Sequence, residues 1–326
     1  MDFSKPDNAR KINKLKVLSA IKSLESPTRA ELSRYLLLNK VSISEIVDAL
    51  IKEGLVKESS KIFYSSGRPG TLLEINRASG VVLSMTLDKT GCYLAASDTL
   101  GKTIRLERFS RGLERKTLSE NFQQSLKRII KNESEKIYGM VAATDEDLSF
   151  FFSQISIPSI SVSPIIARCV NEREKMKNEN QRILFVDLDD EPSALYCDSS
   201  FMKLNPLFEG FESIKSISRR KGTASSSIFS QEDEESVNYI LSVADKIASA
   251  CTVLNIDSVL LMGSLSQLSQ NMLLALKNRV NSLTGGMEIR CASSQRGEIE
   301  GSAIIALDAF FYKKRMLELI KKAEKF

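Results

Sequence analysis

The sequence predicts an α/β protein that begins with a small domain of three helices and a two-stranded hairpin. Residues 9–54 contain three short helical patterns, separated by turn and capping residues. Two strand-like runs, KIFY (61–64) and TLLEI (71–75), flank the turn SSGRPG (65–70). From residue 78 onward, apolar strands alternate with amphipathic helices, which is typical of an α/β fold.

Each of the three N-terminal helices is predicted from local signals. The first, over residues 9–24, has lysines on one face and four apolar residues on the other: Ile12, Leu15, Leu18 and Ile21. Thr28 and Glu31 have the spacing of a capping box, which begins the second helix. Asn39 is the expected N-cap of the third helix, which ends at Gly54. Its inward face is predicted to comprise Ile43, Ile46, Val47 and Leu50.

This order of elements predicts a winged helix-turn-helix with the third helix as the recognition helix. Polar and cationic residues of its first turn, which alternate with apolar residues expected to be buried, would enter a major groove. The wing turn SSGRPG would place Arg68 in a minor groove or against phosphate. The predicted DNA-binding residues are Arg29, Asn39, Lys40, Ser42, Ser44, Lys61 and Arg68. Two alternatives are a solvated turn arginine in a domain that only packs, and a winged helix that contacts proteins.

The positive charge of the chain is confined to this first region. Residues 1–78 contain 14 Lys and Arg and 9 Asp and Glu, a net charge of +5, which equals the net charge of the whole chain. The remaining residues contain 32 of each kind (46 minus 14, and 41 minus 9), so their net charge is zero. A basic bias in a small domain favours double-stranded DNA as the partner.

The composition is that of an ordinary globular protein and excludes several classes. Hydrophobic residues make up 42% and charged residues 27% of the 326 residues. No run approaches the roughly 18 apolar residues needed to span a bilayer, and the first residues lack the apolar region of a signal peptide. We therefore expect a cytoplasmic protein with no membrane partner.

Histidine is missing from the sequence, which removes the commonest general base and metal ligand. No CxC or CxxC pair occurs among the five cysteines, so we expect reduced thiols rather than a disulfide framework. These cysteines are Cys92, Cys169, Cys197, Cys251 and Cys291. We expect no metal site and no cofactor.

The N-terminal region resembles the DNA-binding domain of ROK-family transcriptional repressors (repressor, open reading frame, kinase). The resemblance covers about residues 10–76 and rests on a Gly-Arg-Pro wing that follows a helix ending in EGLV. In that family a winged helix precedes a sugar-kinase-like domain. The resemblance therefore implies a winged helix-turn-helix at 1–76 and a two-lobed actin-like, ribonuclease-H-like ROK domain at 77–326. Its first lobe would comprise about 77–165 with the C-terminal helix 304–326, and its second lobe about 166–303.

The residues that support catalysis in ROK kinases are replaced in this sequence. Asp88 keeps the acid of the phosphate-binding turn, but the double glycine after it is lost. Ser163 and Pro164 stand where the family has its sugar-binding Asn and catalytic Asp, and proline accepts no proton. The central glycine-rich stretch and the zinc-binding cysteines are also missing. The resemblance therefore implies no enzyme, no catalytic residues and no family-type zinc.

Three residues in the remodelled kinase motifs are candidates for binding a small-molecule effector: Asp88, Glu212 and Lys215. Other polar clusters have simpler interpretations. LDDEP (188–192) is expected to be a solvated acidic turn rather than a metal site, and QEDEES (231–236) to cap the following helix. RRK (219–221) is expected to begin a mobile loop, with contact to DNA or phosphate as the alternative. The C-terminal segment from 301 is predicted to be one long helix, with Ile304, Leu307, Phe310 and Phe311 in the core.

The sequence thus predicts a DNA-binding transcriptional regulator, a repressor by family habit. It would form a homodimer or higher homo-oligomer through its inactive kinase-like domain and bind a palindromic operator, because a single winged helix buries too little surface for operator affinity. A small molecule in the remodelled domain could be its effector. The alternative is a carbohydrate kinase with an appended DNA-binding domain.

Overall fold

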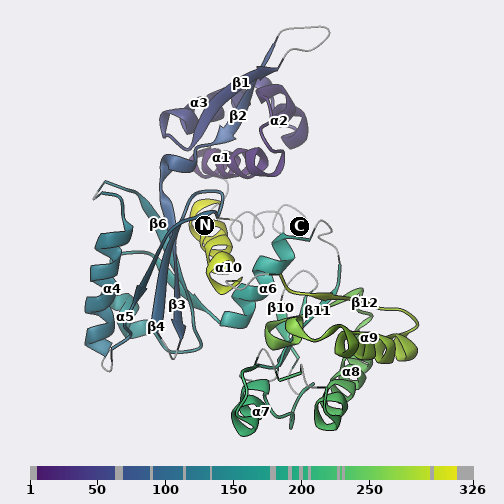
Figure 1. Ribbon diagram of the computed structural model, residues 1–326. Coiled ribbons are helices and arrows are strands. Elements are labelled where there is room, and N and C mark those ends of the chain that lie inside the picture. Colours follow the sequence, from purple (N-terminus) through teal and green to yellow (C-terminus); the bar gives the residue numbers. More distant parts are fainter. Residues whose placement is uncertain are drawn as a thin grey trace. The chain divides into compact units, whose positions relative to one another are not determined.

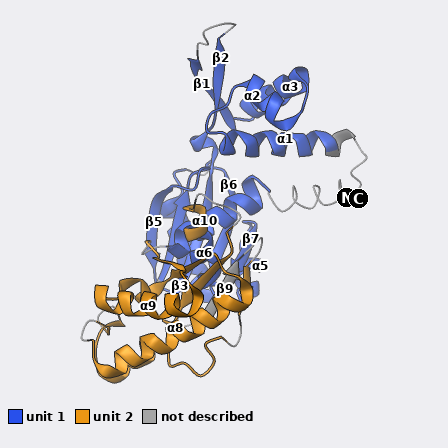
Figure 2. Cartoon of the chain, turned by 90° about the vertical axis from the view of Figure 1, so that its right-hand side faces the viewer, with its two compact units in different colours: residues 1–171, 296–326 blue, residues 172–295 orange. Residues whose placement is uncertain are grey.

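The computed structural model contains two compact units, residues 1–171 with 296–326 and residues 172–295 (Figure 2). Each unit contains a five-stranded mixed sheet, and the first also contains the winged helix. The predicted fold class is therefore confirmed. The structure describes residues 6–62, 69–88, 91–112, 115–132, 134–176, 181–189, 193–197, 201–204, 207–225, 228–229, 232–293 and 297–313.

The N-terminal part of the first unit contains three helices followed by a hairpin (Figure 1). The helices are α1 (Pro6–Ser23), α2 (Arg29–Leu36) and α3 (Lys40–Lys52). The hairpin pairs β1 (Val56–Ile62) with β2 (Gly70–Ile75) in antiparallel register, with an irregularity between Glu58 and Lys61. The predicted winged helix-turn-helix is present, although its first strand begins earlier than expected. The wing tip at 63–68 lies outside the described residues.

The sheet of the first unit has the strand order β5-β4-β3-β6-β7. The strands β3, β4 and β5 form an antiparallel meander, whereas β6 and β7 continue the sheet in parallel. A short 3-10 turn, Arg77–Ser79, precedes β3. The strands are β3 (Val81–Asp88), β4 (Gly91–Ser97), β5 (Thr103–Phe109), β6 (Ile137–Ala143) and β7 (Ser159–Val162). The helices of this unit's lobe are α4 (Arg115–Ile129), α5 (Ser149–Ser153), α6 (Pro164–Glu174) and α10 (Gly297–Ala306).

Both faces of this sheet are covered by helices. Successive strand residues point to opposite faces, and two separate apolar clusters follow that alternation. Leu83 packs with Phe122 of α4 and Phe151 of α5, whereas the adjacent Val82 packs in the cluster that contains Ala303 of α10. Gly301 lets α6 pack closely against α10, because a Cβ there would collide with the backbone of Ala167 in α6.

The second unit repeats the strand order of the first, as β10-β9-β8-β11-β12. Again three antiparallel strands are followed by two parallel ones. Two lobes of the same topology are expected of an actin-like fold. The strands are β8 (Ile183–Asp187), β9 (Ser193–Cys197), β10 (Phe201–Lys203), β11 (Ser258–Leu261) and β12 (Glu288–Cys291). The helices are α7 (Ile214–Lys221), α8 (Glu234–Leu254) and α9 (Gln270–Thr284), and a 3-10 turn follows β11 at Gly263–Gln267.

Helix α8 is long and apolar enough to cross a membrane by length and composition alone. Its apolar side chains are nevertheless used inside the second unit, where Ile240, Val243 and Ile247 are buried in the main apolar cluster. The helix is therefore accounted for as a core helix. Its N-cap is Asp233, as the acidic run 231–236 predicted.

Two sequence-based predictions about local structure are wrong. Residues 219–221 do not begin a loop but form the last turn of α7, which ends at the left-handed Gly222. The C-terminal segment is not one regular helix: α10 already begins at Gly297, and Leu307–Phe311 follow as a π-helical turn. Leu307 and Phe311 are buried as predicted. Residues 314–326 lie outside the described part of the chain.

Candidate nucleic-acid interface

The second helix of the winged helix-turn-helix is fixed at its start by a complete capping box. Glu31 N–H donates to Thr28 Oγ1 at 3.3 Å, and Thr28 N–H donates to Glu31 Oε2 at 2.8 Å. These bonds satisfy two backbone donors that would otherwise lack partners. They also lower the pKa of the Glu31 carboxyl, the bond from the Thr28 backbone contributing most. The prediction of this cap from sequence is confirmed.

The third helix begins at Asn39, whose Oδ1 accepts the backbone N–H of Ser42 at 2.7 Å. The predicted N-cap is therefore confirmed. The inward face is also as predicted, because Ile43, Ile46, Val47 and Leu50 are buried. This packing fixes the rotation of α3 about its own axis and so determines which of its side chains face outward.

The turn between α2 and α3 is held by its own backbone geometry. Leu37 adopts the left-handed conformation with φ of 53°, and its N–H donates to Ser33 O. The hydroxyl of Ser33 donates to Leu38 O at 2.6 Å. This conformation is strained for a residue other than glycine. The hydrogen bonds around Leu37 hold it there and so set the angle between the two helices.

Arg29 has an internal role in the winged helix. Its guanidinium donates to Asp48 Oδ1 at 2.8 Å and to Glu58 Oε1 at 2.9 Å. Partial burial alone would lower the pKa of Arg29, but the bonds to Asp48 and Glu58 outweigh it and raise the pKa. The side chain therefore links α2, α3 and β1. A contact of Arg29 with DNA stays a prediction.

The other predicted DNA-binding residues lie on the surface of α3 and the hairpin. Lys40 is exposed in the first turn of α3 and forms no ion pair with any residue that the structure describes. Ser42 and Ser44 are half-buried on the flanks of the same helix, and Lys61 is exposed on β1. Arg68 lies outside the described residues.

One apolar residue of α3 is not buried as the sequence pattern suggested. The side chain of Val41 is 69% exposed, beside the exposed Lys40. Tyr35 at the end of α2 and Leu37 in the turn are exposed as well. The signal that could have found Val41 is helical periodicity, since it lies two residues before Ile43 and hence on the opposite side of α3.

The candidate effector residues lie in both units, Asp88 in the first and Glu212 and Lys215 in the second. Asp88 ends β3 in the first unit, with its backbone paired to Gly91, and its side chain lies outside the described part. Glu212 and Lys215 are exposed in the second unit, before and within the first turn of α7. Lys215 N–H donates to Asp189 O at 3.0 Å.

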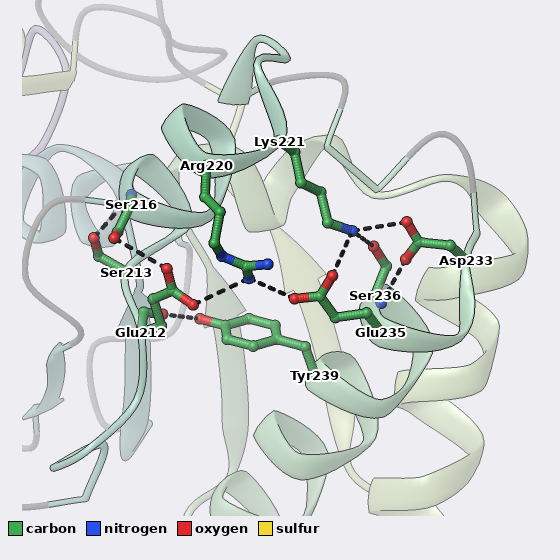
Figure 3. A network of polar contacts seen from close by, with 9 residues as sticks. All are labelled: Glu212, Ser213, Ser216, Arg220, Lys221, Asp233, Glu235, Ser236 and Tyr239. Carbon is green, nitrogen blue, oxygen red and sulfur yellow. Dashed lines mark hydrogen bonds and ion pairs between the residues drawn. The ribbon is translucent and has the colours of Figure 1, made fainter.

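Glu212 belongs to a network of polar contacts that joins α7 to α8 (Figure 3). It accepts hydrogen bonds from Ser216 Oγ at 3.0 Å and from Arg220 at 3.2 Å, and its backbone carbonyl accepts the hydroxyl of Tyr239 at 2.9 Å. Burial raises the pKa of Tyr239. Arg220 also pairs with Glu235, so the arginine bridges two carboxylates.

The other cation of the network is Lys221, which lies 2.7 Å from Asp233 and 3.2 Å from Glu235. Lys221 and the hydroxyl and backbone N–H of Ser236 hold the pKa of Asp233 well below its ordinary value. Arg220 and Lys221 are therefore matched by acids within the second unit. The alternative that RRK contacts DNA or phosphate loses its support for two of its three residues.

In the acidic turn after β8, the described acid Asp189 is half-buried and bound internally rather than fully solvated, whereas residues 190–192 lie outside the described part of the chain. Asp187 is buried, and both carboxylate oxygens of Asp189 accept the backbone N–H of Ser264, at 3.0 and 3.2 Å. A Cβ at Gly263 would collide with Asp189, so this glycine is required. No group of three or more metal-ligating side chains occurs among the described residues.

Comparison with known proteins finds partial similarity to curated repressors and a fold shared with solved structures. No family model matches the chain. The xylose repressor of Caldicellulosiruptor bescii is 33% identical over 95 residues. That stretch is 29% of this chain and 24% of the repressor, so the match spans about a quarter of the relative.

Solved structures match over most of the chain. A ROK-family transcriptional regulator, described as a homologue of the Escherichia coli MLC protein, aligns with 95% of this chain and 99% of its own, with a TM-score of 0.69 and 13% identity. The ROK hexokinase of Thermus thermophilus aligns with 69% of this chain and 97% of its own, with a TM-score of 0.53 and 12% identity. The fold is thus that of ROK proteins with an N-terminal winged helix. The chain is therefore similar in fold to the ROK-family transcriptional regulator, and similar in sequence over 95 residues to xylose repressors.

Proposed function

We propose that this protein is a DNA-binding transcriptional repressor of the ROK type. The observation that carries the proposal is the state of α3, whose inner face is fixed in the core while Lys40 in its first turn is exposed and not ion-paired to any described residue. A recognition helix needs an inner face that is packed rigidly and outward polar side chains that are not already paired within the protein. The relationship to a xylose repressor supports the same function.

We propose further that two copies act together, with the winged helix at 1–76 on DNA and the domain at 77–326 forming the dimer. Two recognition helices in a dimer read half-sites about one helical turn apart, which supplies the contact area that one winged helix lacks. Any effector would be a small molecule held by the kinase-like domain. Roles for Asp88, Glu212 and Lys215 in that site remain predictions. The ion pair of Glu212 with Arg220 weighs against a role for Glu212 in binding the effector.

A carbohydrate kinase is the second candidate, because a ROK hexokinase shares the fold. Pro164, which stands in the position expected for the catalytic base, is the first residue of α6 and has no carboxylate to accept a proton. We therefore propose a protein without kinase activity. Turnover of ATP with any hexose or pentose would contradict this. A repressor working on chromosomal operators would be located in the cytoplasm.

The test of the proposed function is selection of binding sites from randomised duplex DNA with the full-length protein, followed by affinity measurements at several salt concentrations. An enriched inverted repeat with affinity that falls steeply as salt rises is expected of a dimeric repressor. Lys40→Ala should weaken binding to all sequences alike and reduce the salt slope by about one for each recognition helix.

Lys246→Ala is the matched control, since Lys246 is an exposed lysine on α8 of the second unit. It should leave both affinity and salt slope unchanged. Failure to enrich any sequence, with and without candidate sugars present, would contradict the proposed function. Equal effects of the two lysine variants would place the DNA elsewhere than on α3.

A further inference from the structure

The outward face of α3 can be identified from the packing of its inward face. With 3.6 residues per turn, the residues directly opposite Ile43, Ile46, Val47 and Leu50 are spaced at i, i+4, i+7 and i+11. This outward stripe consists of Val41, Glu45, Asp48 and Lys52, all of which are exposed. Its N-terminal end, nearest the turn of the helix-turn-helix, is the part of a recognition helix that meets base edges.

Val41 is the apolar member of this stripe. Glu45 and Lys52 are charged, and Asp48 is held by Arg29. An isolated exposed valine needs no explanation on an ordinary surface, but this one stands where α3 would enter a groove, next to Lys40. The other members of the stripe are charged, so on α3 itself the outward apolar surface is that of one side chain, while the exposed Tyr35 and Leu37 belong to α2 and the turn.

The major groove offers one apolar group of that size. Its edges present hydrogen-bond donors and acceptors at every base pair, and the C5-methyl group of thymine is the apolar exception. A valine cannot read a donor or an acceptor, so it discriminates between bases only through that methyl group. Half-buried Ser42 and Ser44 on the flanks of α3 are short enough to let the helix approach.

We propose that Val41 is a specificity-determining residue that contacts the C5-methyl group of one thymine in each operator half-site. The inference rests on the proposed function and names the chemistry by which that same site chooses its sequence. Lys40 would add affinity without regard to sequence, whereas Val41 would add discrimination.

The experiment replaces each thymine of the selected duplex by deoxyuridine, one symmetric pair at a time. This replacement removes only the methyl group and keeps base pairing. For the unaltered protein, one thymine position should lower affinity about fourfold per half-site when replaced, which is the value of burying one methyl group. Val41→Ala should bind the thymine and deoxyuridine forms of that site alike.

Val253→Ala is the matched control, because Val253 is 81% exposed on α8 in the second unit. It should keep the full response to deoxyuridine. Equal deoxyuridine responses of Val41→Ala and the unaltered protein at every thymine would overturn the inference and leave the proposed function standing. So would a loss of affinity in Val41→Ala that is the same for selected and random DNA. If no DNA is selected at all, the proposed function fails first and the inference with it.

Discussion

Lys40 of the winged helix and two basic residues of the second unit differ in whether acids of their own fold pair with them. On α3, Lys40 is exposed and forms no ion pair with a described residue. In the second unit, Arg220 bridges Glu212 and Glu235, and Lys221 bridges Asp233 and Glu235. In the sequence, both Lys40 and the RRK stretch (219–221) were candidates for contact with DNA or phosphate. The difference teaches that a basic residue is a candidate for binding an anion only after the acids of its own fold are taken into account.

Arg29 and Arg220 refine this comparison, since each arginine contacts two carboxylates. The side chain of Arg29 is 29% exposed and joins three elements of one small domain, whereas that of Arg220 is 51% exposed. Ion pairs that are well exposed contribute little to stability because water and salt screen them. We therefore expect the Arg29 pairs to shape the recognition surface and the Arg220 pairs to matter only weakly.

The largest effect is expected from the inner face of α3. Leu50→Ala removes a fully buried side chain from the core of the winged helix and should cost about 2–5 kcal/mol of unfolding free energy. Denaturant unfolding followed by circular dichroism measures this cost. Val41→Ala on the outer face of the same helix is the control and should change stability little. Similar losses in both variants would contradict the assignment of inner and outer faces.

A smaller effect is expected at the capping box of α2. Thr28→Ala removes the side-chain cap and should cost about 1 kcal/mol. The stability of the unaltered protein should also depend on pH through Glu31, whose pKa is lowered in the folded state. A lowered carboxyl pKa stabilises the fold above the unfolded pKa, and this stabilisation is lost as the pH falls through the folded pKa.

Glu31→Gln isolates the acid-dependent part of that effect. Glutamine can complete a capping box but does not titrate, so this variant should lose less stability than the unaltered protein between neutral and acid pH. Thermal unfolding at a series of pH values is the measurement. A pH profile identical to that of the unaltered protein would show that the bonds to Thr28 do not shift Glu31.

Local sequence signals predicted the winged helix well, because its caps and turns are set by residues three or four apart. Thr28 with Glu31, and Asn39 with Ser42, are such pairs. The exposure of Val41 was missed because the first turn was interpreted as an alternation of polar and buried apolar residues, although helical spacing places Val41 opposite Ile43.

The structure of the second unit could not be predicted at the same level. Arg220 meets Glu235 fifteen residues away, and Asp189 meets Ser264 at a separation of 75 residues. Such pairs form only after α7, α8 and the β11 turn are packed, so no local pattern reveals them. The expected loop at 219–221 was wrong for this reason, and the internal hydrogen bonds of Asp189 in the turn after β8 were not foreseen. The predicted domain boundaries, and the effector site, stay predictions.

The smallest effect on stability is expected from the network between α7 and α8, and it also gives the sharpest test of the comparison. Arg220→Ala should lower the melting temperature slightly at low salt and not at high salt, because its partners are exposed and screened. It should leave DNA affinity unchanged. Lys40→Ala should do the reverse, weakening DNA binding at low salt while leaving the melting temperature unchanged.

Measuring DNA affinity and melting temperature for Arg220→Ala and for Lys40→Ala decides whether these two basic residues have separate roles. The control is Arg220→Lys, which keeps one positive charge near Glu212 and Glu235 and should recover part of the low-salt stability. A loss of DNA affinity in Arg220→Ala with no change in melting temperature would mean that Arg220 leaves Glu212 and Glu235 to contact DNA. In that case Glu212 and Glu235 would compete with DNA phosphate for Arg220 rather than pair with it permanently. Lys40 and Arg220 would then differ only in how readily each is available to bind DNA.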